Sequence, residues 1–216
     1  MIETLIKGGI VMVPLLLCSI AAMAVLIDRY LAFRENGKID TRSLRSNVLR
    51  LVREDRVAEA IQLCANTPGP VSAVILVGLQ TYEKFSALNE SPDSLRLMVG
   101  DAMNDYSLHA TSAVEKRLGV LNTVGNAAPL FGMTGTVTGM ITSFEAMAAS
   151  GGVDSALAAQ GISEALITTA AGLVIALMAV LPYQWFTSRA NEIDLEIQEG
   201  ITELIDVITV KSRLAK

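Results

Sequence analysis

The feature that most constrains this chain is a run of 71 residues, 118–188, that contains no lysine and no arginine. Only three acidic residues, Glu145, Asp154 and Glu164, lie within it. A water-exposed domain rarely leaves so long a stretch without a basic side chain, whereas a membrane-embedded region excludes charge because hydrocarbon does not solvate it. The run therefore predicts membrane structure, in keeping with 51% hydrophobic and 18% charged residues over the 216-residue chain.

Three segments have the roughly 20 apolar residues that a helix needs to cross a hydrocarbon core of about 30 Å. They are residues 9–27, 120–145 and 162–186. The first resembles a secretory signal because Ala22-Met23-Ala24 has a cleavage pattern. Its basic residues follow the apolar run instead of preceding it, so we expect a retained membrane helix.

The distribution of basic residues predicts the topology. Residues 28–117 carry 12 Lys or Arg, the tail from Arg189 carries four, and residues 146–161 carry none. Because basic loops stay in the cytoplasm, we expect residues 28–119 and 187–216 there. Residues 1–8 and 146–161 are then on the other side of the membrane, periplasmic or extracellular.

The predicted cytoplasmic parts have helical patterns. Apolar residues recur at helical spacing in 44–52, in the short segment 71–85 and along the tail. Asp55 is expected to cap a helix that follows it, and Ser91-Pro92-Asp93 is a typical helix start. No breaker separates Pro92 from Leu118, so one long helix should run into the second membrane segment. The predicted fold class is an all-α polytopic membrane protein with three transmembrane helices, two of them extending into long cytoplasmic helices.

The second and third membrane segments are rich in small residues, which let helices approach closely. Those that we expect at the helix contact are Gly132, Gly135, Gly139 and Gly172. Close packing explains such residues as well as any function does, so they identify a contact and not an activity.

Glu164 is the sharper signal, because it lies about one turn inside an apolar segment and no basic residue in the predicted membrane helices can pair with it. One interpretation is a first-turn acid near the lipid headgroups, which the helix dipole favours. The other is a pore-facing carboxylate that gains and loses a proton. At 100° per residue, Thr168 shares its face while Thr169 is offset by roughly 140°. Thr136 is a further polar candidate, whose hydroxyl could equally bond its own helix.

Several function classes find little support. The net charge of −5 and the absence of a basic groove argue against a nucleic-acid partner. Cys18 and Cys64 lie far apart and His109 is the single histidine, which leaves few ligands for a metal. We therefore predict no metal, no cofactor and no enzymatic activity.

The sequence closely resembles the TolQ/ExbB proton-channel family, to which MotA is a more distant relative. The resemblance lies in PLFGMTGTVTGM at 129–140 and GISEALITTAAGL at 161–173, with GGIVMVPLLL at 8–17 and Asp28-Arg29-Tyr30 similar to the first helix. It implies a homopentamer whose central pore, lined by the second and third helices, encloses the single membrane helices of an ExbD/TolR-like dimer. Glu164, Thr136 and Thr169 match pore-lining residues of the family.

In such a motor, proton flow turns the pentamer around its partner and passes work to a TonB- or TolA-like periplasm-spanning protein. Glu145 departs from the family pattern and suggests a second acid at the outer mouth. The rival hypothesis is a non-conducting membrane scaffold for single-span partners, and a small-solute transporter fits poorly without an internal repeat. The sequence leaves open whether the process is nutrient uptake, envelope maintenance, secretion or gliding.

Overall fold

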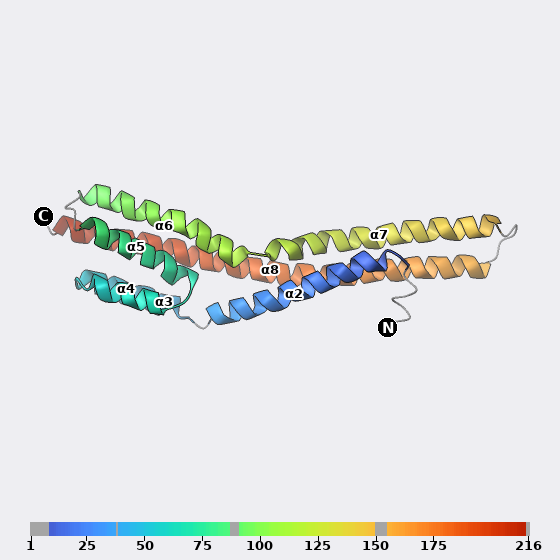
Figure 1. Ribbon diagram of the computed structural model, residues 1–216, viewed down its shortest axis with the longest axis horizontal. Coiled ribbons are helices and arrows are strands. Elements are labelled where there is room, and N and C mark those ends of the chain that lie inside the picture. Colours follow the sequence, from blue (N-terminus) through green and yellow to red (C-terminus); the bar gives the residue numbers. More distant parts are fainter. Residues whose placement is uncertain (1–8, 38, 87–90, 150–154, 215–216) are drawn as a thin grey trace. The chain divides into compact units, whose positions relative to one another are not determined.

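The computed structural model describes residues 9–37, 39–86, 91–149 and 155–214, which form seven helices (Figure 1). The predicted segment 1–8 and residues 150–154 of the predicted loop 146–161 lie outside these residues, and the other residues of that loop are helical. The helices are α2 (Met12–Asn36), α3 (Thr41–Arg53), α4 (Val57–Asn66), α5 (Pro70–Ser86), α6 (Pro92–Glu115), α7 (Leu118–Ala149) and α8 (Ser155–Leu214).

The helices divide into two compact units. One holds residues 9–30 and Arg117–Phe186, and thus most of α2, all of α7 and the first part of α8. The other holds Leu31–Lys116 with residues 187–214, and thus α3 to α6 and the second part of α8. The all-helical class is confirmed, and α8 is one continuous helix of 60 residues.

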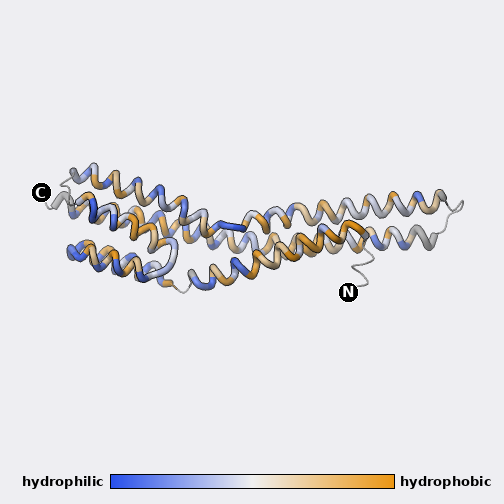
Figure 2. The backbone as a smooth tube through the Cα atoms, viewed as in Figure 1, coloured by the Kyte–Doolittle hydropathy of each residue, from blue (hydrophilic) through white to orange (hydrophobic). Residues whose placement is uncertain are grey.

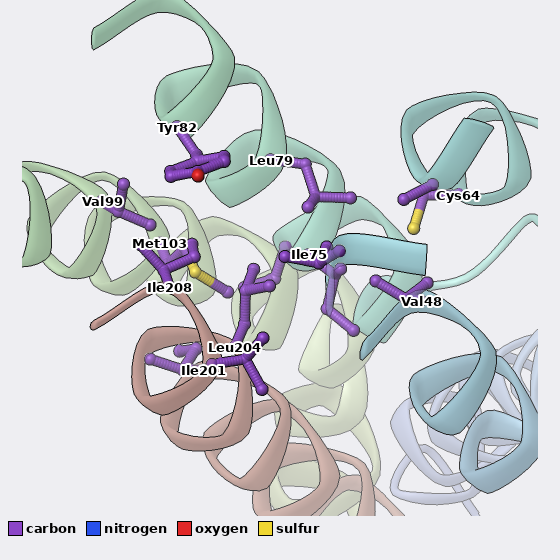
Figure 3. Close-up of a cluster of buried hydrophobic side chains, with 14 of the residues drawn as sticks. Val48, Cys64, Ile75, Leu79, Tyr82, Val99, Met103, Ile201, Leu204 and Ile208 are labelled. Atoms are coloured by element: carbon purple, nitrogen blue, oxygen red, sulfur yellow. The ribbon is translucent and has the colours of Figure 1, made fainter. Parts of the chain in front are cut away.

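The unit of α3 to α6 has a conventional apolar core, which five helices supply (Figure 3). Val48 of α3, Leu79 of α5, Met103 of α6 and Ile208 of α8 are each 1% exposed or less. Cys64 of α4 closes one side of this cluster. The short apolar segment 71–85 is therefore a core helix, as predicted, because α5 buries its apolar side chains against protein.

The unit of α2, α7 and α8 leaves many of its large apolar side chains exposed. Figure 2 shows that α2 is strongly hydrophobic over most of its length, yet Val13, Leu17 and Ile20 are each more than half exposed. Soluble monomers rarely present such continuous apolar surface. Within the described residues, two helical stretches, Met12–Glu35 and Ala159–Lys211, are long and apolar enough to cross a membrane, and most residues of each apolar window are not buried.

Helix α7 is not one of the two helical stretches that are apolar enough to cross a membrane, although its 32 residues are long enough. It contains many glycines and threonines and two asparagines, which are less apolar than leucine, isoleucine or valine. The same small and hydroxyl-bearing residues let it contact α8 closely, as described below. The prediction of three membrane crossings therefore stays a prediction for α7.

The structure corrects two details of the predicted helices. α6 and α7 are separate, because Arg117 adopts a left-handed backbone with φ 69° and ends the helical path after Glu115. A non-glycine residue rarely adopts this conformation, and the Arg117 side chain is held by Asp28, 3.1 Å away. Asp55 also has a positive φ and does not cap α4, whose N-cap is Arg56. The predicted start of α6 is confirmed, since Ser91 accepts a hydrogen bond from the Ser94 backbone.

Candidate functional site

Two threonine hydroxyls meet where α7 and α8 cross most closely. Thr169 Oγ1 of α8 donates to the carbonyl oxygen of Gly132 on α7 at 2.8 Å. Thr136 Oγ1 lies 2.7 Å from Thr169 Oγ1. Thr136 Oγ1 also donates within its own helix, to the carbonyl oxygens of Met133 at 3.0 Å and Gly132 at 3.2 Å. A hydroxyl has one proton and two lone pairs, and either threonine can be the donor in the contact between them. The two hydroxyls thus form a pair between α7 and α8.

Glycine makes this contact possible. A methyl group added at Gly132 would lie 3.1 Å from Thr169 Cα, and one at Gly172 would lie 2.6 Å from the Ala128 carbonyl oxygen. At Gly139 the nearest atom would be Ala165 Cβ at 2.9 Å. Gly135 faces the Thr168 side chain at 2.5 Å. All four glycines identified in the sequence thus lie between α7 and α8, and at Gly132 and Gly172 backbone approaches backbone.

Thr168 and Glu164 share a side of α8 but have different surroundings. Thr168 is 1% exposed, faces Gly135 and donates its hydroxyl to the Glu164 backbone carbonyl at 3.0 Å. Glu164 is half-buried. Among residues 9–37, 39–86, 91–149 and 155–214, its carboxylate has no hydrogen bond or ion pair. Thr168 is therefore a buried contact residue, while Glu164 keeps a carboxylate that the described chain does not neutralise.

The structure does not bring Glu164 to the hydroxyl pair within one copy of the chain. Five residues separate Glu164 from Thr169, which corresponds to roughly 7.5 Å along the helix and 140° around it. Glu145 is exposed and lies near the end of α7. Nine residues separate it from Thr136, so the two side chains project from opposite faces of α7. Thr136 and Thr169 are thus joined, and the two acids lie apart from them.

Two further polar groups in this unit have partners that the sequence pattern does not predict. Ser143 of α7 is 6% exposed and donates to the Gly139 carbonyl at 2.6 Å. Asp28 of α2 binds Arg29 at 2.8 Å as well as Arg117, which ties the end of the apolar stretch of α2 to the start of α7. For Asp28, the signal in the sequence was its position beside Arg29, directly after the first apolar run.

Metal ligands do not cluster in the described residues, where no three His, Cys, Asp or Glu side chains come together. Cys18 and Cys64 are both free thiols. Burial raises the pKa of the Cys64 thiol to about 11, which keeps it protonated at neutral pH. The site is thus built from hydroxyl groups, a carboxylate and backbone carbonyls.

Fold and site together define a class: an all-helical protein with exposed apolar helices of membrane-spanning length and a hydroxyl pair at a glycine-lined helix contact. Residues 67–199 match the model of the MotA/TolQ/ExbB proton channel family. The chain therefore belongs to this family, which confirms the resemblance seen in its sequence. The family and the apolar helices together indicate an inner-membrane protein.

Individual relatives agree with this family. A biopolymer transport protein of Synechocystis sp., named ExbB-like 1, is 33% identical over 197 residues, or 89% of this chain and 72% of its own length. The Tol-Pal system protein TolQ of Pseudomonas aeruginosa is 32% identical over 163 residues, 68% of this chain and 71% of its own. The biopolymer transport protein ExbB of Pseudomonas putida is 26% identical over 200 residues, 93% of this chain and 59% of its own.

Proposed function

We propose that this chain is the proton-channel and stator subunit of an inner-membrane motor that couples the proton motive force to work on a periplasm-spanning protein. The observation that carries the proposal is the 2.7 Å contact between the Thr136 and Thr169 hydroxyls at a close helix crossing. Hydroxyl groups in an otherwise apolar crossing can pass or solvate a proton. The surrounding helices offer lipid the apolar surface that a membrane motor needs.

In this mechanism Glu164 is the group that gains and loses the proton. A carboxylate inside an apolar segment is costly unless it is neutral, solvated or paired, and no described residue pairs with it. Because the hydroxyl pair lies on another face of α8, a proton must travel between the two through a group from outside a single copy. Glu145, which is exposed near the end of α7, serves as an acid at the outer mouth.

The partners follow from the same proposal. Five copies form a ring whose α7 and α8 helices surround the single-span helices of an ExbD/TolR-like dimer, and a partner carboxylate bridges Glu164 and the hydroxyl pair.

The N-terminus lies in the periplasm and the C-terminus in the cytoplasm, with α7 as the third crossing. A TonB- or TolA-like protein receives the work. The proton motive force can supply the free energy for this work, since one charge that crosses 100 mV releases about 2.3 kcal/mol. The proposal includes no enzymatic activity.

The test is proton flux into liposomes that contain this protein with its single-span partner. We expect the flux to be lost in Glu164→Gln and reduced in Thr169→Val. Glu192→Gln, which alters an exposed acid on the same helix, should leave it unchanged. Flux that survives Glu164→Gln, or that is absent from a verified intact complex, would favour the scaffold hypothesis, in which Glu164 serves assembly alone.

A further inference from the structure

The face of α8 that carries Glu164 is polar at one end and apolar at the other. Four residues share this face because they recur at helical spacing, namely Glu164, Thr168, Ala171 and Ile175. Ala171 and Ile175 pack against the buried apolar cluster of this unit, which Leu15 of α2 enters with 1% exposure. Glu164 lies about two turns from Ala171 and is half-buried. Helix α2 therefore covers the apolar half of this face.

The cover by α2 ends at the level of Thr168. A methyl group added at Gly135 of α7 would lie 2.5 Å from Thr168 Cγ2 and 3.5 Å from Val11 Cγ1, so these three residues meet at one point. Helix α2 begins at the residue after Val11, and Ile10, directly before it, is 88% exposed. Figure 1 shows that α7 and α8 continue past the beginning of α2. Glu164, one turn beyond Thr168, therefore lies past the part of α8 that α2 covers.

Two exposed threonines of α7 lie on the same side of the α7–α8 contact as Glu164. At 100° per residue, Thr142 lies roughly 20° and Thr138 roughly 60° around α7 from Gly135, in the direction away from the hydroxyl pair. Gly135 itself faces Thr168, which shares the face of Glu164. The contact between α7 and α8 thus separates two polar sides, one with the hydroxyl pair and the other with Glu164, Thr138 and Thr142.

These two threonines are also level with Glu164. A methyl group added at Gly139 would lie 2.9 Å from Ala165 Cβ, and α7 and α8 run in opposite directions, so Glu164 is level with about residue 140. Thr138 and Thr142 each lie about 3 Å from that level at 1.5 Å per residue. Both donate to carbonyl oxygens of their own helix at 3.0 Å. A hydroxyl oxygen that donates in this way can still accept a hydrogen bond from water.

The two threonines belong to a polar strip of the exposed surface of α7, which we call the threonine face. Its four members fall within roughly 80° of one another at 100° per residue, and they are Thr134, Thr138, Thr142 and Glu145. The exposed surface beside it carries large apolar side chains, namely Leu130, Met133, Val137, Met140, Ile141 and Phe144. A threonine that bonds its own helix is tolerated on any face, so this bonding does not explain why three gather beside an acid. The threonine face suits water, whereas the apolar surface suits lipid.

Toward the start of α7 the threonine side becomes apolar. Phe131 lies on this side of α7, two turns before Thr138. Because the contact of Gly132 with Thr169 makes Phe131 level with about residue 170 of α8, it lies at the level of Ala171 and the cluster that α2 enters. On both helices, the polar side chains therefore end where the cover by α2 begins.

We propose that protons reach Glu164 from the outer end of the membrane helices along the threonine face, past Glu145, Thr142 and Thr138, and that the apolar cluster around Leu15 closes this route toward the cytoplasm. Water held by the threonine oxygens passes the proton to the Glu164 carboxylate. Thr138 and Thr142 are positioning residues, since they hold water and are not themselves titrated. The inference rests on the proposed function and assigns the outer half of its proton path to residues other than the hydroxyl pair.

The test is the water accessibility of single cysteines in the full chain, co-expressed with its partner in a Cys18→Ala and Cys64→Ala background. Thr138→Cys and Thr142→Cys are treated with a charged methanethiosulfonate, which does not cross the membrane and reacts with thiols in water. The reagent is added to spheroplasts to reach the outer side and to inverted vesicles to reach the cytoplasmic side. The matched control is Val137→Cys, because Val137 is also exposed but lies on the apolar surface of α7.

We expect labelling of Thr138→Cys and Thr142→Cys in spheroplasts, little labelling of Val137→Cys, and no labelling of the threonine positions in inverted vesicles. Glu35→Cys, at an exposed residue of the proposed cytoplasmic side, shows that the reagent reaches its target in those vesicles. Equal labelling of Val137→Cys overturns the inference, as does labelling of the threonine positions from the cytoplasmic side. Absence of labelling from the outer side overturns it as well.

Proton flux in the liposome assay gives an independent readout. We expect Thr138→Val combined with Thr142→Val to lower the flux severalfold, and serine at both positions to preserve it because serine keeps the hydroxyl. Thr123→Val is the matched control, since Thr123 is exposed near the other end of α7 and bonds its own helix at 2.9 Å. Flux that the valine replacements leave unchanged, while Glu164→Gln abolishes it, overturns the inference and leaves the proposed function standing. Flux that survives Glu164→Gln refutes the proposed function and the inference with it.

Discussion

Replacing Gly172 with alanine should loosen the contact between α7 and α8. The new methyl would lie 2.6 Å from the Ala128 carbonyl oxygen, whereas ordinary contact begins at 3.4 Å, so the atoms must separate by about 0.8 Å. The next neighbours are Gly132 Cα at 3.1 Å and Gly132 N at 3.3 Å. All three are backbone atoms, which cannot move aside as a side chain can. We expect a loss of about 1–3 kcal/mol in the stability of this unit, as for other overpacked cores.

The measurement is the thermal midpoint of the purified protein in detergent, followed by the fluorescence of Trp185, the single tryptophan of the chain. Gly119→Ala is the matched control, since it lies on α7 with nothing within 4 Å of the added methyl. Alanine also raises helix propensity at both positions, so the control corrects for that gain. If Gly172→Ala melts at or above the temperature of Gly119→Ala, the helices are not in backbone contact at this point and the reasoning fails.

Three further predictions concern the unit of α3 to α6. Lys211→Met should lower its stability by about 1–2 kcal/mol in chemical denaturation, because Lys211 Nζ donates to the Val52 carbonyl at 3.0 Å, which otherwise accepts the longer bond from Asp55 N at 3.3 Å. The hydrogen bond from Lys211 lowers the pKa of Asp55 below its usual 3.8. Its stabilising effect should therefore be complete above that value and disappear as pH falls through the lowered pKa, and Asp55→Asn should flatten this part of a stability-against-pH curve. Cys64 is buried, with its pKa raised to about 11, so iodoacetamide at pH 8 should modify it only after unfolding, as mass spectrometry can follow.

The helices themselves could be predicted because each has a local signal. Proline at the start of α5 and α6, a serine cap before α6 and apolar residues at helical spacing are all properties of short segments. The end of α6 has no such signal. A left-handed Arg117 is stabilised by Asp28, which lies almost ninety residues earlier in the chain. Asp55 is similar, since its partner Lys211 comes from the far end of the chain.

The candidate site could be predicted as a set of residues but not as an arrangement. Helix geometry alone predicts that Thr169 lies on a different face of its helix from Glu164 and Thr168. It cannot say that Thr168 packs into the space at Gly135, or that Thr169 reaches across to Gly132 and Thr136. Those contacts depend on the relative rotation of α7 and α8, which the sum of many small side-chain contacts decides.

The continuity of α8 fixes the angular phase of its side chains. A residue inserted between Phe186 and Thr187 would turn every later side chain by about 100° and advance it by about 1.5 Å. It would carry Ile197 and Ile208 out of the core that they now fill. The same insertion between Lys116 and Arg117 falls at a break in the helical path, where loop backbone can absorb it without turning either α6 or α7. The chain passes between the two units three times, and in the described residues the passages after Tyr30 and Phe186 lie inside α2 and α8, whereas the one after Lys116 falls between two helices.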